Sequence, residues 1–270
     1  MLSDITIGQY FPGKSIVHRL DPRMKLVLII AFIVVLFVVS SALSFLVLDV
    51  FLIITILLSK IPIKAIWKGI KPILPLVLFT AVLNLFFVDG TPLVAFWVFR
   101  ITVEGLQMAG LMAVRIVTLI VVSSLLTYTT SPIALTDALE RLLGPLRFIR
   151  FPVHEMAMMM TIALRFIPTL LEETDKIMSA QKARGADLET GGIMKRAKAL
   201  IPILIPLFVS AFRRAEELAL AMECRCYRGG DGRTRMKQLK LKGMDFSILA
   251  IVVGVFAGAI VLNIFVPYLF

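Results

Sequence analysis

Long runs of apolar residues, almost free of charge, dominate this sequence. The runs cover residues 26–58, 73–88, 105–128 and 246–266. A helix that crosses a membrane needs about 20 predominantly apolar residues. Inside lipid every backbone amide must find its hydrogen bond within its own segment, which a helix achieves. We therefore predict an all-α polytopic membrane protein rather than a chain that folds in water.

The first of these runs is too long for a single crossing. As one α-helix, residues 26–58 would extend about 50 Å, whereas the hydrocarbon core of a bilayer is about 30 Å thick. Ser40 and Ser41 near the middle of the run predict a tight connection between two short spans. Together with the other three runs, this gives about five transmembrane helices.

The composition excludes several other classes of protein. Apolar residues make up 59% and charged residues 17% of the 270 residues, whereas soluble domains are roughly half apolar and one quarter charged. A net charge of +11 would suggest nucleic acid as the partner of a soluble protein. In a membrane protein it is typical of basic cytoplasmic loops, so we expect membrane lipid and no nucleic acid as a partner.

The basic residues also predict an orientation. All of them except Arg100 and Arg115 lie within residues 1–25, 60–71 and 129–243. Five spans place these three regions on one side of the membrane, and the positive-inside rule makes that side cytoplasmic. We therefore predict a multi-pass protein of the cell membrane with its N-terminus in the cytoplasm and its C-terminus outside.

The chain divides into residues 1–128 with the first four spans, residues 129–243 as a cytoplasmic module, and residues 244–270 with the fifth span. The module is too charged to cross a membrane repeatedly and too apolar for an ordinary loop. Its prolines and glycines predict a short helix over 132–143 and two long amphipathic helices over 152–184 and 193–228. Each long helix starts apolar, becomes charged and ends in an arginine near a helix-stopping glycine. Such a module implies a partner.

Two short motifs suggest ligands, but their surroundings support neither. Residues 8–15 match the phosphate-binding pattern G-x4-G-K-S, which needs a preceding buried strand and a following helix. Cys224 and Cys226 could bind zinc, but zinc takes about four ligands, and no further cysteine or histidine is near them. The sequence also shows no catalytic constellation. We therefore expect no enzyme activity, metal site or cofactor in this chain.

Several segments together resemble one protein family. They are residues 8–13 (Gly-Gln-Tyr-Phe-Pro-Gly), 17–25, 131–143, 163–168 (Ala-Leu-Arg-Phe-Ile-Pro) and the triplet Ala183-Arg184-Gly185. Over nearly its whole length, the chain resembles the transmembrane coupling subunit of energy-coupling factor (ECF) transporters, the EcfT family. A second arginine triplet, Cys224-Arg225-Cys226, departs from the usual Ala-Arg-Gly but retains the arginine.

The resemblance implies a function as a scaffold. Members of this family join two cytoplasmic ABC-type ATPases, identical or different, to a substrate-binding membrane subunit called the S component. ATP and Mg are bound by the ATPases, and the coupling subunit transmits their motions so that a vitamin or another micronutrient is released into a bacterial cell. The residues implied to bind the ATPases are Ala183, Arg184, Gly185, Cys224, Arg225 and Cys226.

An apolar surface is predicted at the start of the first long helix. Its methionines either pack against other helices of this chain or form an adaptable thioether surface for a partner, and the sequence leaves both open. In the second case the expected partner is the S component. The residues predicted to contact it are Met156, Met159, Met160, Leu164 and Ile167.

Asp49 and Arg115 lie near the middle of the second and fourth predicted spans. Charges at this depth are costly and usually face the protein interior or pair with each other. We predict an ion pair between them, with separate polar partners as the alternative.

A self-contained secondary transporter remains the alternative function. It would require charged or broken helices near the midplane of two repeated halves, and the sequence shows no such halves.

Overall fold

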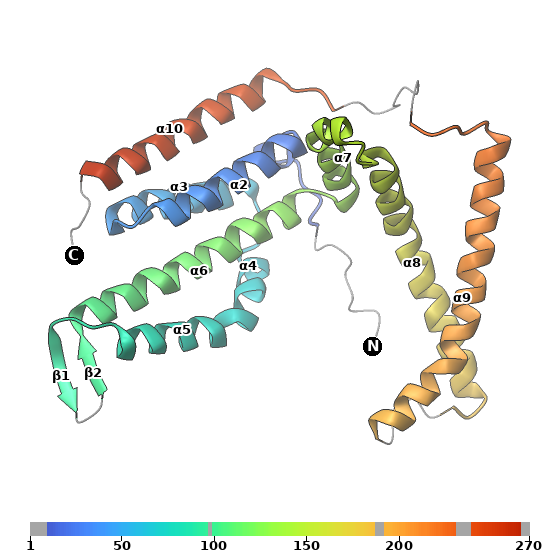
Figure 1. Cartoon of the computed structure of the whole chain (residues 1–270), viewed down its shortest axis with the longest axis horizontal. Helices are drawn as coiled ribbons and strands as arrows, with labels where there is room; N and C mark the ends of the chain where they lie inside the picture. Colours follow the sequence, from blue (N-terminus) through green and yellow to red (C-terminus); the bar gives the residue numbers. More distant parts are fainter. Residues whose placement is uncertain (1–9, 97–98, 187–191, 231–238, 266–270) are drawn as a thin grey trace. The chain divides into compact units, whose positions relative to one another are not determined.

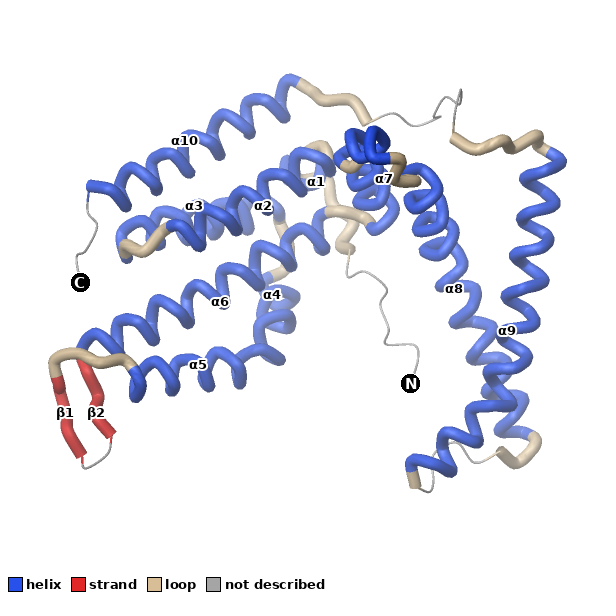
Figure 2. Tube along the Cα trace, in the orientation of Figure 1, coloured by secondary structure: helices blue, strands red, loops and turns tan. Residues whose placement is uncertain are grey.

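The computed structural model describes residues 10–96, 99–186, 192–230 and 239–265, and most of them are helical (Figures 1 and 2). The predicted all-α polytopic class is confirmed. The helices are α1 (Ile16–Arg19), α2 (Pro22–Val38), α3 (Ala42–Ser59), α4 (Ile63–Ile70), α5 (Leu74–Phe87), α6 (Val103–Thr129), α7 (Pro132–Leu142), α8 (Val153–Ala183), α9 (Ile193–Cys224) and α10 (Gly243–Phe265).

Three short elements complete the fold. A 3₁₀ turn, η1 (Lys71–Ile73), links α4 to α5, and a second one, η2 (Gly144–Ile149), precedes α8. An antiparallel hairpin of β1 (Pro92–Phe96) and β2 (Phe99–Thr102) joins α5 to α6. The apolar runs in the sequence give no indication of this hairpin.

By length and composition, four helices among the described residues can cross a membrane. They are α3, the continuous run Ile63–Phe87 that contains α4 and α5, α6 and α10. Helix α2 has 17 residues, or about 26 Å at the standard rise, which is the lower end of the length that spans a bilayer. The predicted number of about five spans is reached when α2 is included.

The connection between α2 and α3 lies where the two serines predict it. Helix α2 ends at Val38 and α3 begins at Ala42, so Ser40 and Ser41 lie in the turn. Their backbone N–H groups both donate to Oδ1 of Asn263 in α10, at 3.0 and 2.9 Å. A side chain of α10 thus satisfies amides that would be costly to leave unpaired in an apolar environment.

The chain forms two compact units. The membrane unit contains the described residues 10–138 and 239–265. Its core lies between α2, α3, α6 and α10, where Leu36 and Leu48 are fully buried. Its surface carries many large apolar side chains that are exposed, among them Val34, Phe37, Leu46, Leu57, Leu78 and Ile251. This surface needs an apolar surrounding, which a lipid bilayer provides.

The α8–α9 unit contains the described residues 139–186 and 192–230. Helices α8 and α9 have 31 and 32 residues. They are joined by an ion pair between Arg214 and Glu173, with Nη2 2.8 Å from Oε2. Helix α9 is bent (Figure 1) and contains Pro202 and Pro206, which each remove a backbone hydrogen bond from a helix.

The segment after α9 returns to the start of α8. The hydroxyl of Tyr227 lies 3.4 Å from Nε2 of His154, and Nδ1 of the same ring lies 3.0 Å from Oε1 of Glu140 in α7. Gly230 packs against this ring so closely that a Cβ atom would overlap it. These contacts fix where the chain goes after α9.

Candidate partner-binding site

Helix α8 ends in a Schellman motif that positions Arg184. Arg184 is the C-cap, with φ −85° and ψ 6°, and Gly185 follows with φ +88°. The N–H of Gly185 donates to the carbonyl of Lys182 at 3.0 Å, and the N–H of Ala186 donates to that of Gln181 at 2.9 Å. Both bonds satisfy carbonyls that a helix end leaves free. Glycine suits the second position because it has no Cβ to crowd the backbone at positive φ.

Helix α9 ends in the same motif around Arg225. Arg225 is the C-cap, with φ −93° and ψ 13°, and Cys226 follows with φ +55°. The N–H of Cys226 donates to Glu223 at 2.8 Å, and the N–H of Tyr227 donates to Met222 at 3.0 Å. A residue with a Cβ pays roughly 1–2 kcal/mol for this left-handed conformation. Cys226 nevertheless takes the backbone role that Gly185 takes in α8.

The predicted end of α9 at Arg228 is wrong. The helix ends at Cys224 because the chain turns at Cys226, ahead of Gly229 and Gly230. Cysteine is not a typical helix-stopping residue, so this turn has no local sequence signal. The earlier end of α9 makes Arg225 the C-cap, in the same position as Arg184 in α8.

All six residues of the two triplets are exposed. Within the part of the chain that the structure describes, neither Arg184 nor Arg225 forms an ion pair. Each guanidinium stands at the C-terminal end of a long helix, where a positive charge is favoured by the helix dipole. The flanking side chains are small, so each cap offers five N–H donors with little to obstruct a partner.

The apolar start of α8 is only partly covered within this chain. Val153 and Ala157 are buried, whereas the side chains of Met159 and Met160 are 61% and 39% exposed. The other residues predicted to contact a partner are half-buried, namely Met156, Leu164 and Ile167. Packing within this chain therefore does not account for Met159 and Met160.

Helix α9 carries a larger apolar surface that was not predicted from the sequence. The exposed residues form two ridges along the helix, Leu200, Leu204, Phe208 and Phe212 beside Ile201, Ile205 and Val209. The signal was present in the sequence, because both ridges repeat at the four-residue spacing that places side chains on one helix face. Exposed apolar surface of this extent in a helix outside the membrane unit indicates an interaction surface.

The contact between Glu173 and Arg214 sets how α8 and α9 lie against each other. Hydrogen bonding from Ser210 holds the pKa of the Glu173 carboxyl below its usual value, and the positive charge of Arg214 adds to this effect. Ser210 and Arg214 both belong to α9, so this helix favours the ionised form of the carboxylate. The contact therefore helps to fix the direction of both long helices, which carry the two arginine caps.

The predicted ion pair between Asp49 and Arg115 is not formed. Oδ1 of Asp49 accepts a hydrogen bond from the hydroxyl of Thr118 at 2.6 Å. Arg115 donates to the carbonyl of Val39 at 2.9 Å and lies 4.9 Å from the ring centroid of Phe45. Thr118 lies close to one helical turn beyond Arg115 in α6, so the rotation of α6 presents the hydroxyl to Asp49.

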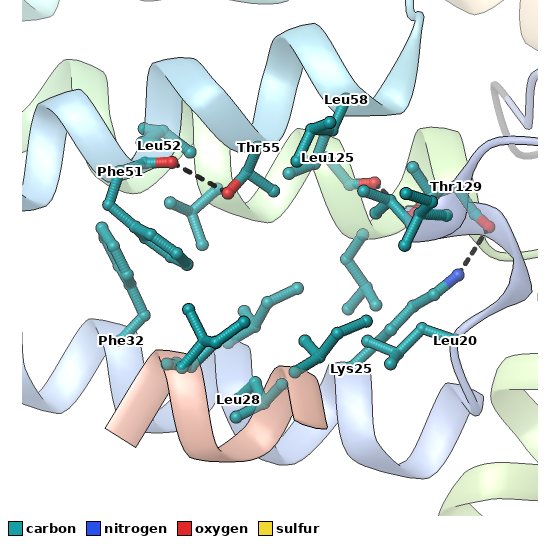
Figure 3. A pocket seen from close by; sticks show the side chains of 18 of the residues that line it. Leu20, Lys25, Leu28, Phe32, Phe51, Leu52, Thr55, Leu58, Leu125 and Thr129 are labelled. Carbon is teal, nitrogen blue, oxygen red and sulfur yellow. Dashed lines mark hydrogen bonds between the residues drawn. The ribbon is translucent and has the colours of Figure 1, made fainter. Parts of the chain in front are cut away.

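The membrane unit contains an apolar cavity of about 200 Å³ between α1, α2, α3, α6 and α10 (Figure 3). Three polar side chains line it, and each donates a hydrogen bond within the chain. Thr55 donates to the carbonyl of Phe51 at 2.8 Å, Thr129 to that of Leu125 at 2.7 Å, and Lys25 to that of Thr129 at 2.9 Å. The two threonine hydroxyls that line the cavity thus use their single donor within the chain, and Lys25 is directed to the end of α6.

The segment that matches a phosphate-binding loop is folded around a histidine. Ser15 caps the four-residue helix α1, and its Oγ lies 2.7 Å from Nδ1 of His18. Nε2 of His18 lies 2.9 Å from the carbonyl oxygen of Phe11. A Cβ atom at Gly13 would lie 2.8 Å from this ring. The ring of His18 therefore occupies the space that the described part of this loop encloses.

Comparisons with known proteins agree on one family. Residues 13–236 match the family model described as cobalt transport protein, CbiQ. The energy-coupling factor transporter transmembrane protein EcfT of Clostridium kluyveri is 60% identical over 248 residues, which cover 91% of this chain and 92% of the relative. The protein of the same name from Ruminiclostridium cellulolyticum is 54% identical over 253 residues, covering 94% and 95%. That from Thermosediminibacter oceani is 51% identical over 265 residues, covering 98% and 100%.

Proposed function

Because the chain belongs to the EcfT family of energy-coupling factor transporter transmembrane proteins, we propose that it is the coupling subunit of an ATP-driven importer. The observation that carries this proposal is the pair of equivalent helix ends at Arg184 and Arg225. Two copies of one geometry match two copies of one binding site. Two homologous ABC-type ATPases, identical or different, would offer such a pair of sites.

Each arginine docks in a groove of one ATPase subunit and meets a carboxylate there. The guanidinium is a rigid fork that binds a carboxylate through two parallel hydrogen bonds. The small residues beside it, Ala183 and Gly185 or Cys224 and Cys226, let the helix end approach the groove closely. Lysine carries the same charge without the fork and is therefore a poor substitute in this role.

The apolar faces of α8 and α9 bind the S component. Met159, Met160 and the two ridges of α9 are exposed within this chain, and an integral membrane subunit presents apolar surface to match them. Motions of the ATPases reach these faces because the arginines stand at the ends of the same two helices. In this arrangement the ATPases bind ATP and Mg, and the S component binds the vitamin or other micronutrient.

The two native cysteines provide a direct test of docking. They are the only cysteines of the chain, they flank Arg225, and both are exposed. A polar maleimide should label them rapidly in the isolated chain and much more slowly once the ATPases are bound. A variant with both cysteines replaced by serine and Ala183→Cys introduced reports on the other cap. Equal labelling with and without ATPases would show that these caps are not the docking points.

Transport itself is tested with the double variant Arg184→Ala, Arg225→Ala. It should release or uncouple both ATPases, measured by co-purification in mild detergent and by uptake of tritiated riboflavin through a riboflavin-binding S component. The control is Arg141→Ala, which removes an exposed arginine from α7, away from both caps and from the apolar faces of α8 and α9. A double variant that holds both ATPases and imports at the normal rate contradicts the proposed coupling role.

The alternative, a self-contained secondary transporter, makes the opposite prediction. Such a protein binds its solute in the membrane unit, whereas the polar side chains that line the apolar cavity already donate within the chain. It would also take up solute without ATPases. Uptake by the purified chain alone, in vesicles with an ion gradient and no ATP, would favour this alternative over the coupling role.

A further inference from the structure

The chain leaves the membrane unit after α6 and returns to it before α10, and one short segment contacts both places. This segment is the start of α2, with the side chains of Asp21, Arg23 and Lys25. We propose that it is a latch that fixes both connections to the α8–α9 unit, so that motion of that unit moves the membrane helices. The inference rests on the proposed coupling function and names residues that position the connections.

The first contact holds the end of α6. Nζ of Lys25 donates to the carbonyl of Thr129, the last residue of α6, at 2.9 Å (Figure 3). It also lies 3.2 Å from the hydroxyl of Thr130. Lys25 is only 5% exposed. Its charge therefore sits against the negative end of the α6 dipole and a carbonyl that the helix itself leaves free. A buried ammonium requires such partners, which makes this contact specific.

The second contact holds the segment that returns to α10. Nη2 of Arg23 donates to the carbonyl of Leu239 at 3.1 Å. The backbone N–H groups of Asp21 and Lys242 donate to the two carboxylate oxygens of Asp245, at 3.2 and 2.7 Å. Asp245 is 1% exposed and lies in the first turn of α10, where a negative charge is favoured. The returning segment is thus fastened at both of its ends to the start of α2.

The start of α2 is itself rigid. Asp21 caps the helix by accepting from the N–H of Arg23 at 2.9 Å, and Pro22 occupies its first turn. The same carboxylate pairs with the guanidinium of Arg23, with Nε 3.1 Å from Oδ1 and Nη2 2.8 Å from Oδ2. The arginine that reaches Leu239 is therefore held in one orientation. This arrangement gives a physical role to the charged sequence Asp-Pro-Arg-Met-Lys.

The position of the latch in the chain follows from the boundaries of the two units. The α8–α9 unit runs from Leu139 to Lys237. Thr130 precedes it by one short helical segment, and Leu239 follows it almost at once. Displacement of that unit can pass along the chain into the membrane unit through these two connections. If their ends were loose, the linkers would absorb the displacement; with both ends fixed on one helix start, α2, α6 and α10 receive it together.

The experiment separates coupling from folding with a matched pair of variants in α10. Asp245→Ala removes an oxygen pair that accepts from two backbone N–H groups at the latch. Asn263→Ala removes an oxygen that likewise accepts from two, those of Ser40 and Ser41 at the connection between α2 and α3. Each variant is measured in the complete complex in vesicles, as riboflavin imported per ATP hydrolysed with a riboflavin-binding S component.

We expect Asp245→Ala to assemble with its partners and to lower the import-to-hydrolysis ratio by about 2- to 30-fold, the range that changes along coupling networks span. Asn263→Ala should keep the normal ratio. An unchanged ratio in Asp245→Ala, or the same loss in both variants, overturns the latch. If the wild-type chain binds no ATPases, the proposed coupling function is contradicted. If the wild-type complex imports riboflavin with ATP hydrolysis and Asp245→Ala keeps the normal ratio, the coupling function stands and only the latch is contradicted.

Arg23→Lys covers the case in which Asp245→Ala does not assemble. Lysine retains the charge but cannot pair with Asp21 through a fork and reach Leu239 in the same geometry. We expect an assembled complex with a lowered ratio. A normal ratio, or loss of assembly in this conservative variant as well, shows that the segment serves folding rather than coupling.

Discussion

Helices α8 and α9 end in the same hydrogen-bond pattern, but a glycine reverses the chain in one and a cysteine in the other. Gly185 has φ +88° and Cys226 has φ +55°. The carbonyls that accept the closing bonds lie at equivalent positions, Gln181 and Lys182 in α8 and Met222 and Glu223 in α9. The geometry around the arginine is thus retained where the residue best suited to it is absent.

This comparison indicates what the two ends are built to present. If only a helix stop were needed at α9, Gly229 and Gly230 would supply it a few residues later. The chain instead turns at Cys226, in a conformation that is unfavourable for cysteine, and so places Arg225 at the C-cap as Arg184 is placed in α8. The shared feature is the position of an exposed guanidinium at the end of a long helix.

The largest effect is expected from removing one arginine at a time. Losing one partner of a desolvated charge pair typically costs about 2–5 kcal/mol, so Arg184→Ala and Arg225→Ala should each weaken ATPase binding by about 30- to several thousand-fold. Because the caps are equivalent in geometry, the two losses should be similar for a complex with identical ATPases. Binding of purified ATPases to each variant measures this. A full loss for one arginine and none for the other would break the equivalence.

The apolar faces of α8 and α9 should affect a different partner. Met159 in α8 and Phe212 in α9 are 61% and 68% exposed, and burying such a side chain against a partner is worth about 1.5–3 kcal/mol. Met159→Gln and Phe212→Gln should therefore weaken S-component association by about 10- to 150-fold and leave ATPase binding intact. Co-purification of both partners measures this, with Lys176→Gln as a control at an exposed charged position. Retention of the S component with loss of the ATPases would mean that the two ends of these helices have been assigned in reverse.

The sequence predicted the parts of this fold that depend on local pattern. Apolar runs located the membrane helices, paired serines located the turn before α3, and Gly185 located the end of α8. The end of α9 could not be found in this way, because Cys226 adopts a conformation that its residue type does not indicate. The ridges of α9 could have been found from their four-residue spacing.

The failed pairing of Asp49 with Arg115 has a different cause. Hydropathy gives the depth of a charge in the membrane, but it does not give the rotation of one helix against another. Successive residues in a helix differ by about 100°, so a modest rotation of α6 presents Thr118 rather than Arg115 to Asp49. The contacts of Lys25 and Asp245 could not be predicted either, because they join residues far apart in the chain and hydropathy does not give such contacts.

The chain reversal itself can be tested with three small substitutions. Gly185→Ala places a Cβ at positive φ and should destabilise the end of α8 by about 1–2 kcal/mol. Cys226→Gly relieves the same strain and should stabilise the end of α9 by less than this, because glycine also gains freedom in the unfolded chain. Gly144→Ala is the control, since Gly144 does not have a positive φ and has open space where its Cβ would lie. Hydrogen exchange at the two helix ends measures all three, and a stabilising Gly185→Ala would show that α8 does not need its glycine.

The smallest effect concerns the contact that keeps α8 and α9 together. The pKa of Glu173 is lowered from an ordinary value of 4.5, first by the hydrogen bond from Ser210 and then by Arg214. A carboxyl with a lowered folded-state pKa contributes its stability fully above the ordinary value and loses it as the pH falls through the lower one. Both side chains of the ion pair are partly exposed, so its contribution to the free energy of unfolding is about 0.2–1 kcal/mol.

Thermal unfolding should therefore show Glu173→Gln slightly less stable than the wild type at pH 7, with the difference closing below pH 4.5. Glu172→Gln, at the exposed neighbouring position, should show no such dependence; a difference for Glu173→Gln that persists in acid would mean that the ionised carboxylate is not what joins the two helices.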